Sequence, residues 1–490
     1  MAIVKKSSAV RKLIATAQGY FSHARAEAQP YAQKARELAV AHRSLLTVAL
    51  VVVAAYVFGA LFGESTFVLA YRSVFSKLVE GRKLQFSHFR KTQLLAEHDE
   101  QFISARYEEL VKLYLGPFAR SSGIYPASYM GIYARESCTE CFMIQIVDGT
   151  IWLVDPRRIH RRGGVEHQMR MREALEWVKL ALKDITGRGE FVDGIEFVVS
   201  VADPIQSTDT THTYNLPESD GVARPVFSVA RCDVSSNIPF PMSLGESLRD
   251  AHPDGFMYRK GIQPQEWDER MVDLGLEDSL AMEKKKPKAV FSGKVAPSSM
   301  FADESRAEDA CGQIGASAID RLSRKERDLV EARVRGRCGL ECCDSGDGEA
   351  FVTPALQQQY LFNIHTEEER LWSNRLPWIL FSSSCPLISV LPCGQWFEPL
   401  LKAFVHYIPV DMSMANLTRT VREWRQKRET YDVMRESQVF ARDYLRVDAI
   451  TMYVRILLLE YLKLQKVRRN EPDPNAIRYF PTYAGNIFDE

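Results

Sequence analysis

Two arginines and a serine in one loop have a spacing that suits an anion. Arg370, Ser373 and Arg375 follow the apolar segment 360–363 and precede a helix predicted over 376–381. Guanidinium groups match the oxygens of a phosphate, and ligands of parallel sheets bind beyond the carboxyl ends of the strands. The loop is therefore a candidate phosphate-binding site. The alternative is a structural βαβ unit with surface arginines, because a fold alone does not fix a function.

An aspartate follows a second buried strand. The segment 195–201 is rich in β-branched residues and leads into Ala202, Asp203 and Pro204. Catalytic bases are often placed at the carboxyl end of such a strand, which makes Asp203 a candidate general base. The alternative is an ordinary turn aspartate before a proline.

A third strand end carries a glycine beside a lysine. The strand predicted from Lys288 ends at Ser292, Gly293 and Lys294. A glycine there can bring backbone N–H groups close to a phosphate, and a lysine adds a positive charge. The segment lacks the spacing of a P-loop, so a plain strand-ending turn is the alternative.

The elements that must position these residues alternate between strands and helices in two blocks. The first block has a hairpin over 141–154, with Asp148 and Gly149 at its turn, then a helix over 166–185. The second block has strands at 288–294, 360–363, 385–391 and 404–410, and is followed by helices up to residue 467. This order predicts an α/β protein with two units and a cleft between them.

The charge balance argues against a nucleic-acid partner, because the chain has 63 Lys+Arg and 63 Asp+Glu and so no basic field. An uncharged apolar run, Leu45 to Gly63, is long enough at ~1.5 Å per residue to cross a bilayer core. Cations dominate the residues before this run, which predicts a single-pass type II protein with a lumenal body. A cleaved signal peptide fits less well, and a mitochondrial presequence is a minor alternative.

We therefore predict seven parts of the chain. They are a cytosolic tail (1–44), a transmembrane anchor (45–63), a stem and helical lead-in (64–130), an N-terminal Rossmann-like domain (131–265), a linker (266–287), a C-terminal Rossmann-like domain (288–435), and C-terminal helices with a tail (436–490). The C-terminus lacks a KDEL-type retrieval signal, which favours the Golgi membrane over the ER membrane.

The chain has nine cysteines, an odd number, so at least one is free or pairs with another chain. Cys138 and Cys141, together with Cys338, Cys342 and Cys343, allow a zinc site as one interpretation. Disulfides or buried thiols are favoured, because the second group lacks regular spacing and no histidine pair stands close by. Asn416 begins the one obvious glycosylation sequon of the predicted lumenal part.

Several segments together resemble a known family. They are 195–203, 225–228, 237–241, 288–293, 360–363 and 405–410, in the family's order. The resemblance is to the Rumi-type protein O-glucosyltransferases and capsule-associated xylosyltransferases of glycosyltransferase family 90, over roughly residues 141–464. It implies a GT-B fold, with two Rossmann-like domains that face a cleft. It also implies a UDP-sugar donor, a protein or glycan acceptor, inversion at the anomeric carbon, and no metal or other cofactor.

The resemblance also implies roles for single residues. Asp203 matches the family's catalytic base. Ser373 and Arg375 match its S-x-R motif at the diphosphate, and Glu398 matches a carboxylate on the ribose or uracil side of the donor. The donor side would also include Ser292, Gly293, Lys294 and Arg370, and the acceptor side Asn237 and Phe240. The family further implies a disulfide from Cys385 to one of Cys338, Cys342 or Cys343.

Three differences from the family concern the donor side. The family's Phe-Arg-Gly-x-Arg is Phe291-Ser292-Gly293-Lys294 here, so both arginines are absent. The loop after Asn363 carries Glu367, Glu368 and Glu369, and carboxylates repel a diphosphate. Leu376 and Pro377 replace the small residue or lysine that usually follows the S-x-R. These differences define the alternative function, a catalytically impaired member that acts as a lumenal binding or scaffold protein.

Overall fold

The structure is a computed structural model. It describes residues 98–121, 123–126, 128, 140–154, 165–202, 224–232, 235–242, 244, 267–268, 271, 284–294, 315–335, 352–366, 372–391 and 393–479. The chain divides into two compact units, Met1–Thr92 and Gln93–Glu490, and all described residues belong to the second. The predicted tail, anchor and most of the stem therefore lie outside the described residues. Within the described part, no helix is both long enough and apolar enough to cross a membrane.

The first sheet has six strands in the spatial order β13-β2-β1-β3-β4-β6. They are β1 (Cys141–Val147), β2 (Thr150–Val154), β3 (Ile195–Ser200), β4 (Val226–Ser228), β6 (Ile238–Pro239) and β13 (Ala476–Arg478). The turn between β1 and β2 has positive φ at Asp148 (50°) and Gly149 (66°), as tight hairpins require. Strands β3, β4 and β6 are parallel. Their carboxyl ends therefore share one edge of the sheet, and Asp203 follows that end of β3 in the sequence.

The second sheet has five parallel strands in the order β12-β10-β9-β7-β8. They are β7 (Lys286–Lys294), β8 (Val330–Arg335), β9 (Tyr360–His365), β10 (Cys385–Ser389) and β12 (Ile408–Val410). Every residue of β9 and β10 is buried, as in parallel sheets covered on both faces. This sheet has a separate hydrophobic core, which includes Phe291, Phe362 and Leu387.

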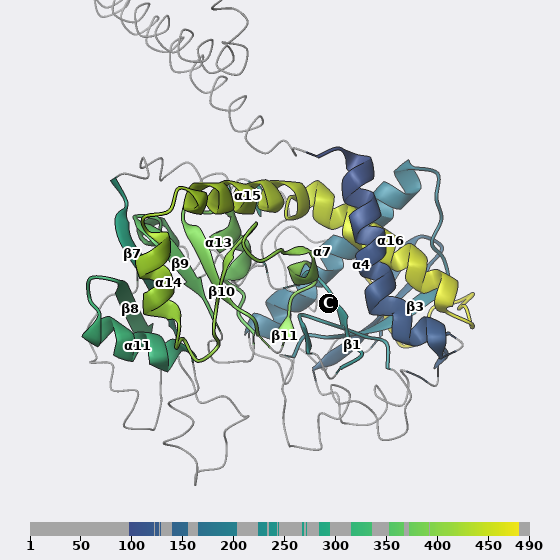
Figure 1. The fold of residues 1–490 in the computed structure, drawn as a ribbon. Coiled ribbons are helices and arrows are strands. Elements are labelled where there is room, and N and C mark those ends of the chain that lie inside the picture. Colours follow the sequence, from purple (N-terminus) through teal and green to yellow (C-terminus); the bar gives the residue numbers. More distant parts are fainter. Residues whose placement is uncertain are drawn as a thin grey trace, which may run out of the picture. The chain divides into compact units, whose positions relative to one another are not determined.

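Helices cover this second sheet and flank its strands (Figure 1). They are α11 (Gly315–Lys325), α12 (Pro354–Gln357), α13 (Leu376–Phe381), α14 (Leu417–Trp424) and α15 (Glu429–Tyr444). Helix α11 packs on β7 and β8, α13 on β9, and α15 on β10 and α13. Leu417 and Val421 of α14 contribute to the core of this sheet. Strand and helix therefore alternate from β7 to β10.

The C-terminal part of the chain returns to the first sheet (Figure 1). Helix α16 (Val447–Leu464) packs on α4 (Glu100–Arg120) and on α7 (Val165–Gly187). Strand β13 then pairs with β2. The chain after β12 therefore contacts both sheets, with α15 on the second and α16 beside the first.

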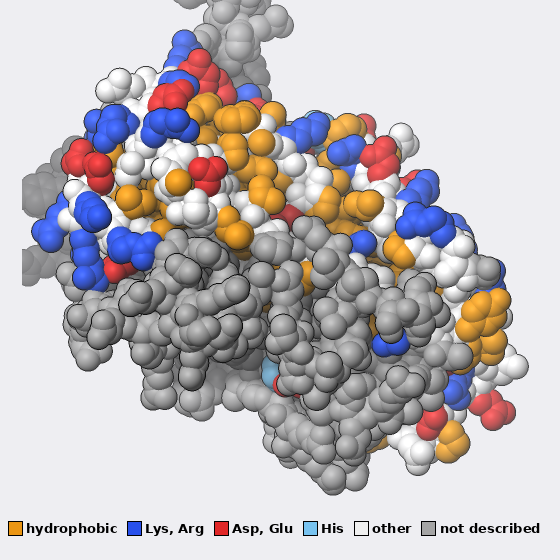
Figure 2. Space-filling view, turned by 60° about the horizontal axis from the view of Figure 1, so that its bottom comes forward, with side chains coloured by type: hydrophobic (Ala, Val, Ile, Leu, Met, Phe, Trp, Pro, Cys, Tyr) orange, Lys and Arg blue, Asp and Glu red, His pale blue; other side chains and the backbone are white. Residues whose placement is uncertain are grey.

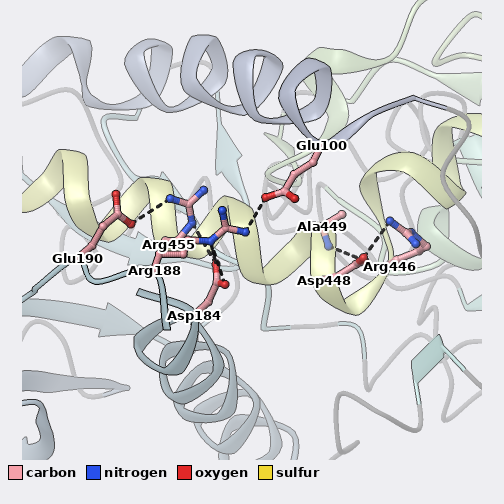
Figure 3. Close-up of polar contacts among 8 residues, drawn as sticks. All are labelled: Glu100, Asp184, Arg188, Glu190, Arg446, Asp448, Ala449 and Arg455. Atoms are coloured by element: carbon pink, nitrogen blue, oxygen red, sulfur yellow. Dashed lines mark hydrogen bonds and ion pairs between the residues drawn. The ribbon is translucent and has the colours of Figure 1, made fainter. Parts of the chain in front are cut away.

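An ion-pair network joins the three helices α4, α7 and α16 (Figure 3). Arg455 of α16 contacts Asp184 at 3.1 Å and Glu190 at 3.2 Å. Arg188, just after α7, contacts Asp184 at 3.1 Å and Glu100 of α4 at 2.5 Å. Because Arg455 and Asp184 are largely buried, this network fixes how the helices pack more firmly than an exposed pair would.

A short ribbon joins the segments that follow the two sheets. Strand β5 (Arg231–Cys232), just after β4, pairs antiparallel with β11 (Cys393–Gly394), just after β10. A disulfide connects Cys232 to Cys393 across this ribbon, over 161 residues of sequence. The ribbon therefore holds the carboxyl-end loop of one sheet against that of the other.

The structure confirms the predicted hairpin, the long helix after it, and the strands at 195–201, 360–363 and 385–391. Between β10 and β12 the described chain forms a 3₁₀ turn, η7 (Glu398–Leu400), and no α-helix. Trp267, in the segment predicted as a linker, is buried, and its indole N–H donates to the carbonyl of Leu445 at 2.7 Å. All the predicted domain boundaries, including those of the linker, stay predictions.

The disulfide expected at Cys385 is wrong, because this cysteine is free. Its side chain lies in the core of the five-stranded sheet, on β10, which is paired on both sides. Burial raises the pKa of this thiol far above its ordinary value, so it does not supply a reactive thiolate. Cys141 is disulfide-bonded, which excludes it from the alternative zinc site. Cys138, Cys338, Cys342 and Cys343 lie outside the described residues.

Candidate functional site

Arg375 is the best-defined predicted site residue, and it is buried at the start of α13. Its Nη2 donates to Oε1 of Gln357 at 3.0 Å. Its guanidinium lies 4.8 Å from the ring centre of Phe291 and 5.6 Å from that of Trp378. The aromatic faces and the amide fix the plane of the guanidinium, so its charge is held in one orientation before any ligand binds.

Gln395 links the predicted diphosphate segment to the predicted nucleoside carboxylate. Its side-chain Nε2 donates to the carbonyl of Ser373 at 2.9 Å, and its backbone N–H donates to Glu398 Oε1 at 2.7 Å. Ser373 Oγ accepts from the backbone N–H of Arg375 at 3.3 Å. Ser373, Arg375 and Glu398 therefore lie in one hydrogen-bonded assembly, although they come from two loops.

Glu398 occupies a site that disfavours its charge. Burial raises the pKa of its carboxyl to about 7, and the N–H of Gln395 offsets only part of that rise. A β-carbon on Gly394 would lie 3.1 Å from Glu398 Oε2, so this glycine permits the close approach of the carboxyl. Around neutral pH the Glu398 carboxyl can exist in both forms, and it can donate or accept a hydrogen bond.

This pKa predicts how stability depends on pH. The folded state keeps the Glu398 proton up to about pH 7, whereas the unfolded chain loses it near 4.5. The unfolding free energy should therefore fall as the pH rises from 4.5 to 7. In wild type this fall in unfolding free energy should be roughly 1–2 kcal/mol, a figure reduced because Glu398 is only partly buried. Glu398→Gln should abolish it. Denaturant unfolding at pH 4.5, 6 and 7.5 measures it.

Asp268 provides a comparison for that experiment. Burial raises the pKa of this carboxyl to about 6. Asp268→Asn should therefore also remove a fall in unfolding free energy with rising pH, but that fall ends near pH 6 instead of pH 7. Identical pH profiles for wild type and Glu398→Gln would contradict the assignment for Glu398.

Arg170 contacts the segments that follow β3 and β9, and both segments lead to predicted site residues. It is completely buried, and its Nη1 donates to the carbonyl of Val201 at 2.7 Å. Its guanidinium also lies 5.7 Å from the ring centre of Trp372. Val201 stands two residues before Asp203, and Trp372 immediately precedes Ser373. One side chain of α7 therefore contacts both the end of β3 and the loop that leads to Arg375.

The glycine-containing strand end at β7 lies in the same region. The backbone N–H of Val352 donates to Ser292 Oγ at 3.0 Å, and Ser292 is completely buried. Gly293 and Lys294 continue β7 to its carboxyl end, beside β8. Since Ser292 adjoins Phe291, the ring that stacks on Arg375, the structure brings this predicted donor segment to the Arg375 region.

The remaining predicted residues are placed differently. Asn237 and Phe240 flank β6, and both are buried. Phe240 packs edge to face on Phe227. The burial of Phe240 is typical of a packing residue. The acceptor role of both residues stays a prediction. Asn416 stands just before α14, where its Oδ1 accepts from the backbone N–H of Asp411 at 2.9 Å. Asp203 and Arg370 lie outside the described residues.

Sequence reasoning missed Arg170 and Gln395. Gln395 could have been noticed, because it stands three residues before Glu398, a spacing that permits a turn with a side-chain acceptor. Arg170 gives no such signal, because it is one of many charged residues of α7 and its contacts are distant in the sequence.

Elsewhere among the described residues, the surface features do not compete with this site. A hollow of about 750 Å³ lies beside the α4 ion-pair network, and no predicted site residue lines it. On the face shown in Figure 2, the described Lys and Arg side chains are interspersed with Asp and Glu. Within the described residues, no group of three His, Cys, Asp or Glu side chains could hold a metal ion.

The fold and these contacts define an α/β protein with Rossmann-like parallel strands, in which carboxyl-end loops of two sheets meet. The sequence profile described as glycosyl transferase family 90 matches residues 140–477, more than half of the chain. The chain therefore belongs to glycosyltransferase family 90, and its predicted membership is confirmed. The family indicates glycosyltransferase activity, with a sugar donor and an acceptor as partners. No curated protein matches the chain significantly.

Proposed function

We propose that the protein is an inverting glycosyltransferase that transfers glucose or xylose from a UDP-sugar to a hydroxyl group of a protein or glycan. The observation that carries this proposal is the fixed guanidinium of Arg375, linked through Ser373 and Gln395 to Glu398. A fixed cation and a carboxyl group, connected through these hydrogen bonds, suit the two ends of a nucleoside diphosphate. The balanced surface charge is compatible with a small anionic ligand rather than a nucleic acid.

The proposed fold is GT-B, with each sheet in one Rossmann-like domain and the site between them. The separate core of the five-stranded sheet supports this division. The parallel strands β3, β4 and β6 support a Rossmann-like N-terminal domain. Here the five-stranded domain would bind the donor, and the end of β3 would face the acceptor.

In the proposed reaction, Asp203 removes the proton of the acceptor hydroxyl while that oxygen attacks the anomeric carbon of the sugar. The bond from that carbon to the UDP oxygen breaks, and UDP leaves with its electron pair. Arg375 offsets the negative charge that grows on the leaving diphosphate. No metal or other cofactor has a role in this proposal.

We predict that Arg375→Met weakens UDP binding by about 30- to 150-fold, because a charge-assisted contact to phosphate contributes roughly 2–3 kcal/mol. Isothermal titration calorimetry with UDP measures this. Arg435→Met is the matched control, since Arg435 lies on α15 with its side chain 68% exposed. Equal UDP affinities in wild type and a folded Arg375→Met variant would contradict the donor role of Arg375.

A second prediction concerns Arg170 as a positioning residue. Arg170→Met removes both the hydrogen bond to Val201 and the contact with Trp372. We expect kcat to fall by about 10- to 100-fold, because small misplacement of a base is costly, while UDP affinity changes less than about threefold. Trp372→Leu should reproduce this pattern. A loss of UDP affinity that equals the loss of kcat would indicate general unfolding instead.

We also propose that the body lies in the lumen of the Golgi or ER, with Leu45 to Gly63 as a type II anchor. The disulfide between Cys232 and Cys393 supports an oxidising compartment. A protease-protection experiment on microsomes tests this topology. Digestion of the C-terminal body from outside intact vesicles would contradict it.

The alternative, a binding or scaffold protein without transfer activity, is favoured by one specific feature. Ser292 stands where the family has its first arginine, and only Lys294 could partly replace the missing charge. The Ser292 hydroxyl bonds within the protein. In that case UDP binding would be absent or would occur without turnover.

A further inference from the structure

Two neighbouring side chains of β9 are buried, and their polar atoms form no hydrogen bond with any residue that the structure describes. Asn363 and His365 are 0% and 1% exposed. The side-chain Nδ2 and Oδ1 of Asn363, and both ring nitrogens of His365, have no hydrogen-bond partner within this described part of the chain. Among the buried described side chains with unpaired polar atoms, only these two have a pair of them. Buried polar groups are paired in the great majority of cases, so four unpaired atoms in two residues need an explanation.

Both side chains point to one face of the five-stranded sheet. Residues two apart on a strand share a face, so Asn363 and His365 lie side by side near the carboxyl end of β9. Val290 pairs with Asn363, which places Ser292 on the same face two residues further along β7. Arg375 lies close enough for its charge to act on the His365 ring. The unpaired atoms are therefore in the region of the proposed donor site.

The polar groups around them are satisfied, so the region is not generally short of partners. Ser389 Oγ lies 3.1 Å from Thr366 Oγ1, within hydrogen-bonding distance. Ser384 Oγ donates to the carbonyl of Tyr360 at 2.7 Å. Among the described residues of β9 and β10, the buried side-chain polar atoms without a partner belong to Asn363 and His365 alone.

The chemistry of these atoms selects the kind of group that can satisfy them. Burial, with a smaller effect of Arg375, lowers the pKa of His365 to about 3, so the ring is neutral at neutral pH. A neutral imidazole offers one donor and one acceptor, and an amide offers two donors and one acceptor. A phosphate or carboxylate would satisfy only the donors. A hydroxyl group both donates and accepts, so neighbouring hydroxyl groups match both side chains.

We propose that Asn363 and His365 bind hydroxyl groups of the transferred sugar and thereby determine which donor sugar is accepted. This inference rests on the proposed function, because only a UDP-sugar would bring a polyol next to Arg375. The unpaired atoms then have a functional reason: they lower the stability of the unliganded protein and are satisfied when the sugar binds.

The test compares the binding of UDP, UDP-glucose and UDP-xylose by calorimetry in wild type, Asn363→Leu and His365→Phe. The affinity for UDP should stay within about twofold, because neither residue contacts UDP in this proposal. The ratio of UDP-sugar affinity to UDP affinity should fall by about tenfold for at least one sugar, as the loss of one or two hydrogen bonds predicts. Melting temperatures should be equal or higher, since the variants remove unpaired buried polar groups.

Ser389→Ala is the control, because Ser389 is a buried polar residue of the adjacent strand with its partners inside the protein. It should leave the affinity ratio unchanged. If a variant does not fold, His365→Asn shortens the side chain, keeps it polar and gives the same readout.

Two outcomes overturn the inference, and they differ from a failure of the proposed function. An unchanged affinity ratio together with a lower melting temperature would show that Asn363 and His365 serve the fold alone. An unchanged ratio with unchanged stability would show that they have no role in sugar binding. If wild type binds no UDP at all, the proposed function fails, and the inference fails with it.

Discussion

Asp203→Asn is expected to reduce sugar transfer by about 10²- to 10⁴-fold, the range that a general base contributes. The variant keeps the size and polarity of the side chain but cannot take the proton of the acceptor hydroxyl. UDP affinity should stay within about twofold, because the base acts on the acceptor and not on the nucleotide. Transfer rates and UDP titration on the same preparation separate these effects.

The comparison variant for this experiment is Asp193→Asn. Asp193 lies before β3, at the amino end of the strand, where its carboxylate accepts from the backbone N–H of Asp148 at 2.7 Å. It should leave transfer unchanged. Persistent transfer by Asp203→Asn would refute the base assignment and return Asp203 to its alternative, an ordinary turn residue before a proline.

Removal of the disulfide between Cys232 and Cys393 is expected to have the largest effect on stability. The bond closes a loop of 161 residues, and loss of a disulfide costs about 2–5 kcal/mol. The double variant Cys232→Ala/Cys393→Ala should therefore unfold at distinctly lower denaturant concentration. It should also weaken UDP binding, because the β5–β11 ribbon immediately precedes Gln395 and Glu398.

Cys385→Ala is the matched control for this loss. Cys385 is a free, buried thiol, so its replacement removes only a small apolar group from the core. Addition of reductant should destabilise wild type and Cys385→Ala alike, and should destabilise the double variant less, since that variant retains only the disulfide of Cys141 among the described residues. A double variant as stable as wild type would contradict the role of the ribbon in holding the two sheets together.

Local features of the fold could be predicted from the sequence, and distant pairings could not. Asp148 and Gly149 predict the hairpin because few residue pairs adopt positive φ twice. The β-branched run of β3 likewise predicts a buried strand. By contrast, β13 has only three residues, Ala476–Arg478, and no alternating pattern. Its place beside β2 depends on the long helix α16, which returns the chain to the first sheet.

In the candidate site, too, local features could be predicted from the sequence and contacts between distant segments could not. Ser373 and Arg375 could be found from residue type and spacing, because a guanidinium after a strand end predicts anion binding. Their connection to Glu398 could not, since it passes through the side chain of Gln395 in another loop. The burial of Glu398 could not be predicted from the sequence either. Its pKa of about 7 follows from the surrounding protein and not from the local sequence.

The disulfide prediction failed for a physical reason. Cys385 was expected to pair because related chains suggest a bond at this strand, yet its side chain points into the core of the five-stranded sheet. Cys393, eight residues later, emerges in β11 beside β5 and meets Cys232 there. The sequence shows which cysteines are available for disulfides, and the fold determines which of them pair.

The most direct test of the proposed function is a calorimetric titration of the purified protein with UDP in the presence of EDTA. The arrangement of Arg375, Ser373 and Glu398 predicts saturable binding with a Kd below about 1 mM, or more than ~4 kcal/mol of binding free energy, without a metal ion. No heat of binding at millimolar UDP would contradict the assignment of this site to a UDP-sugar donor.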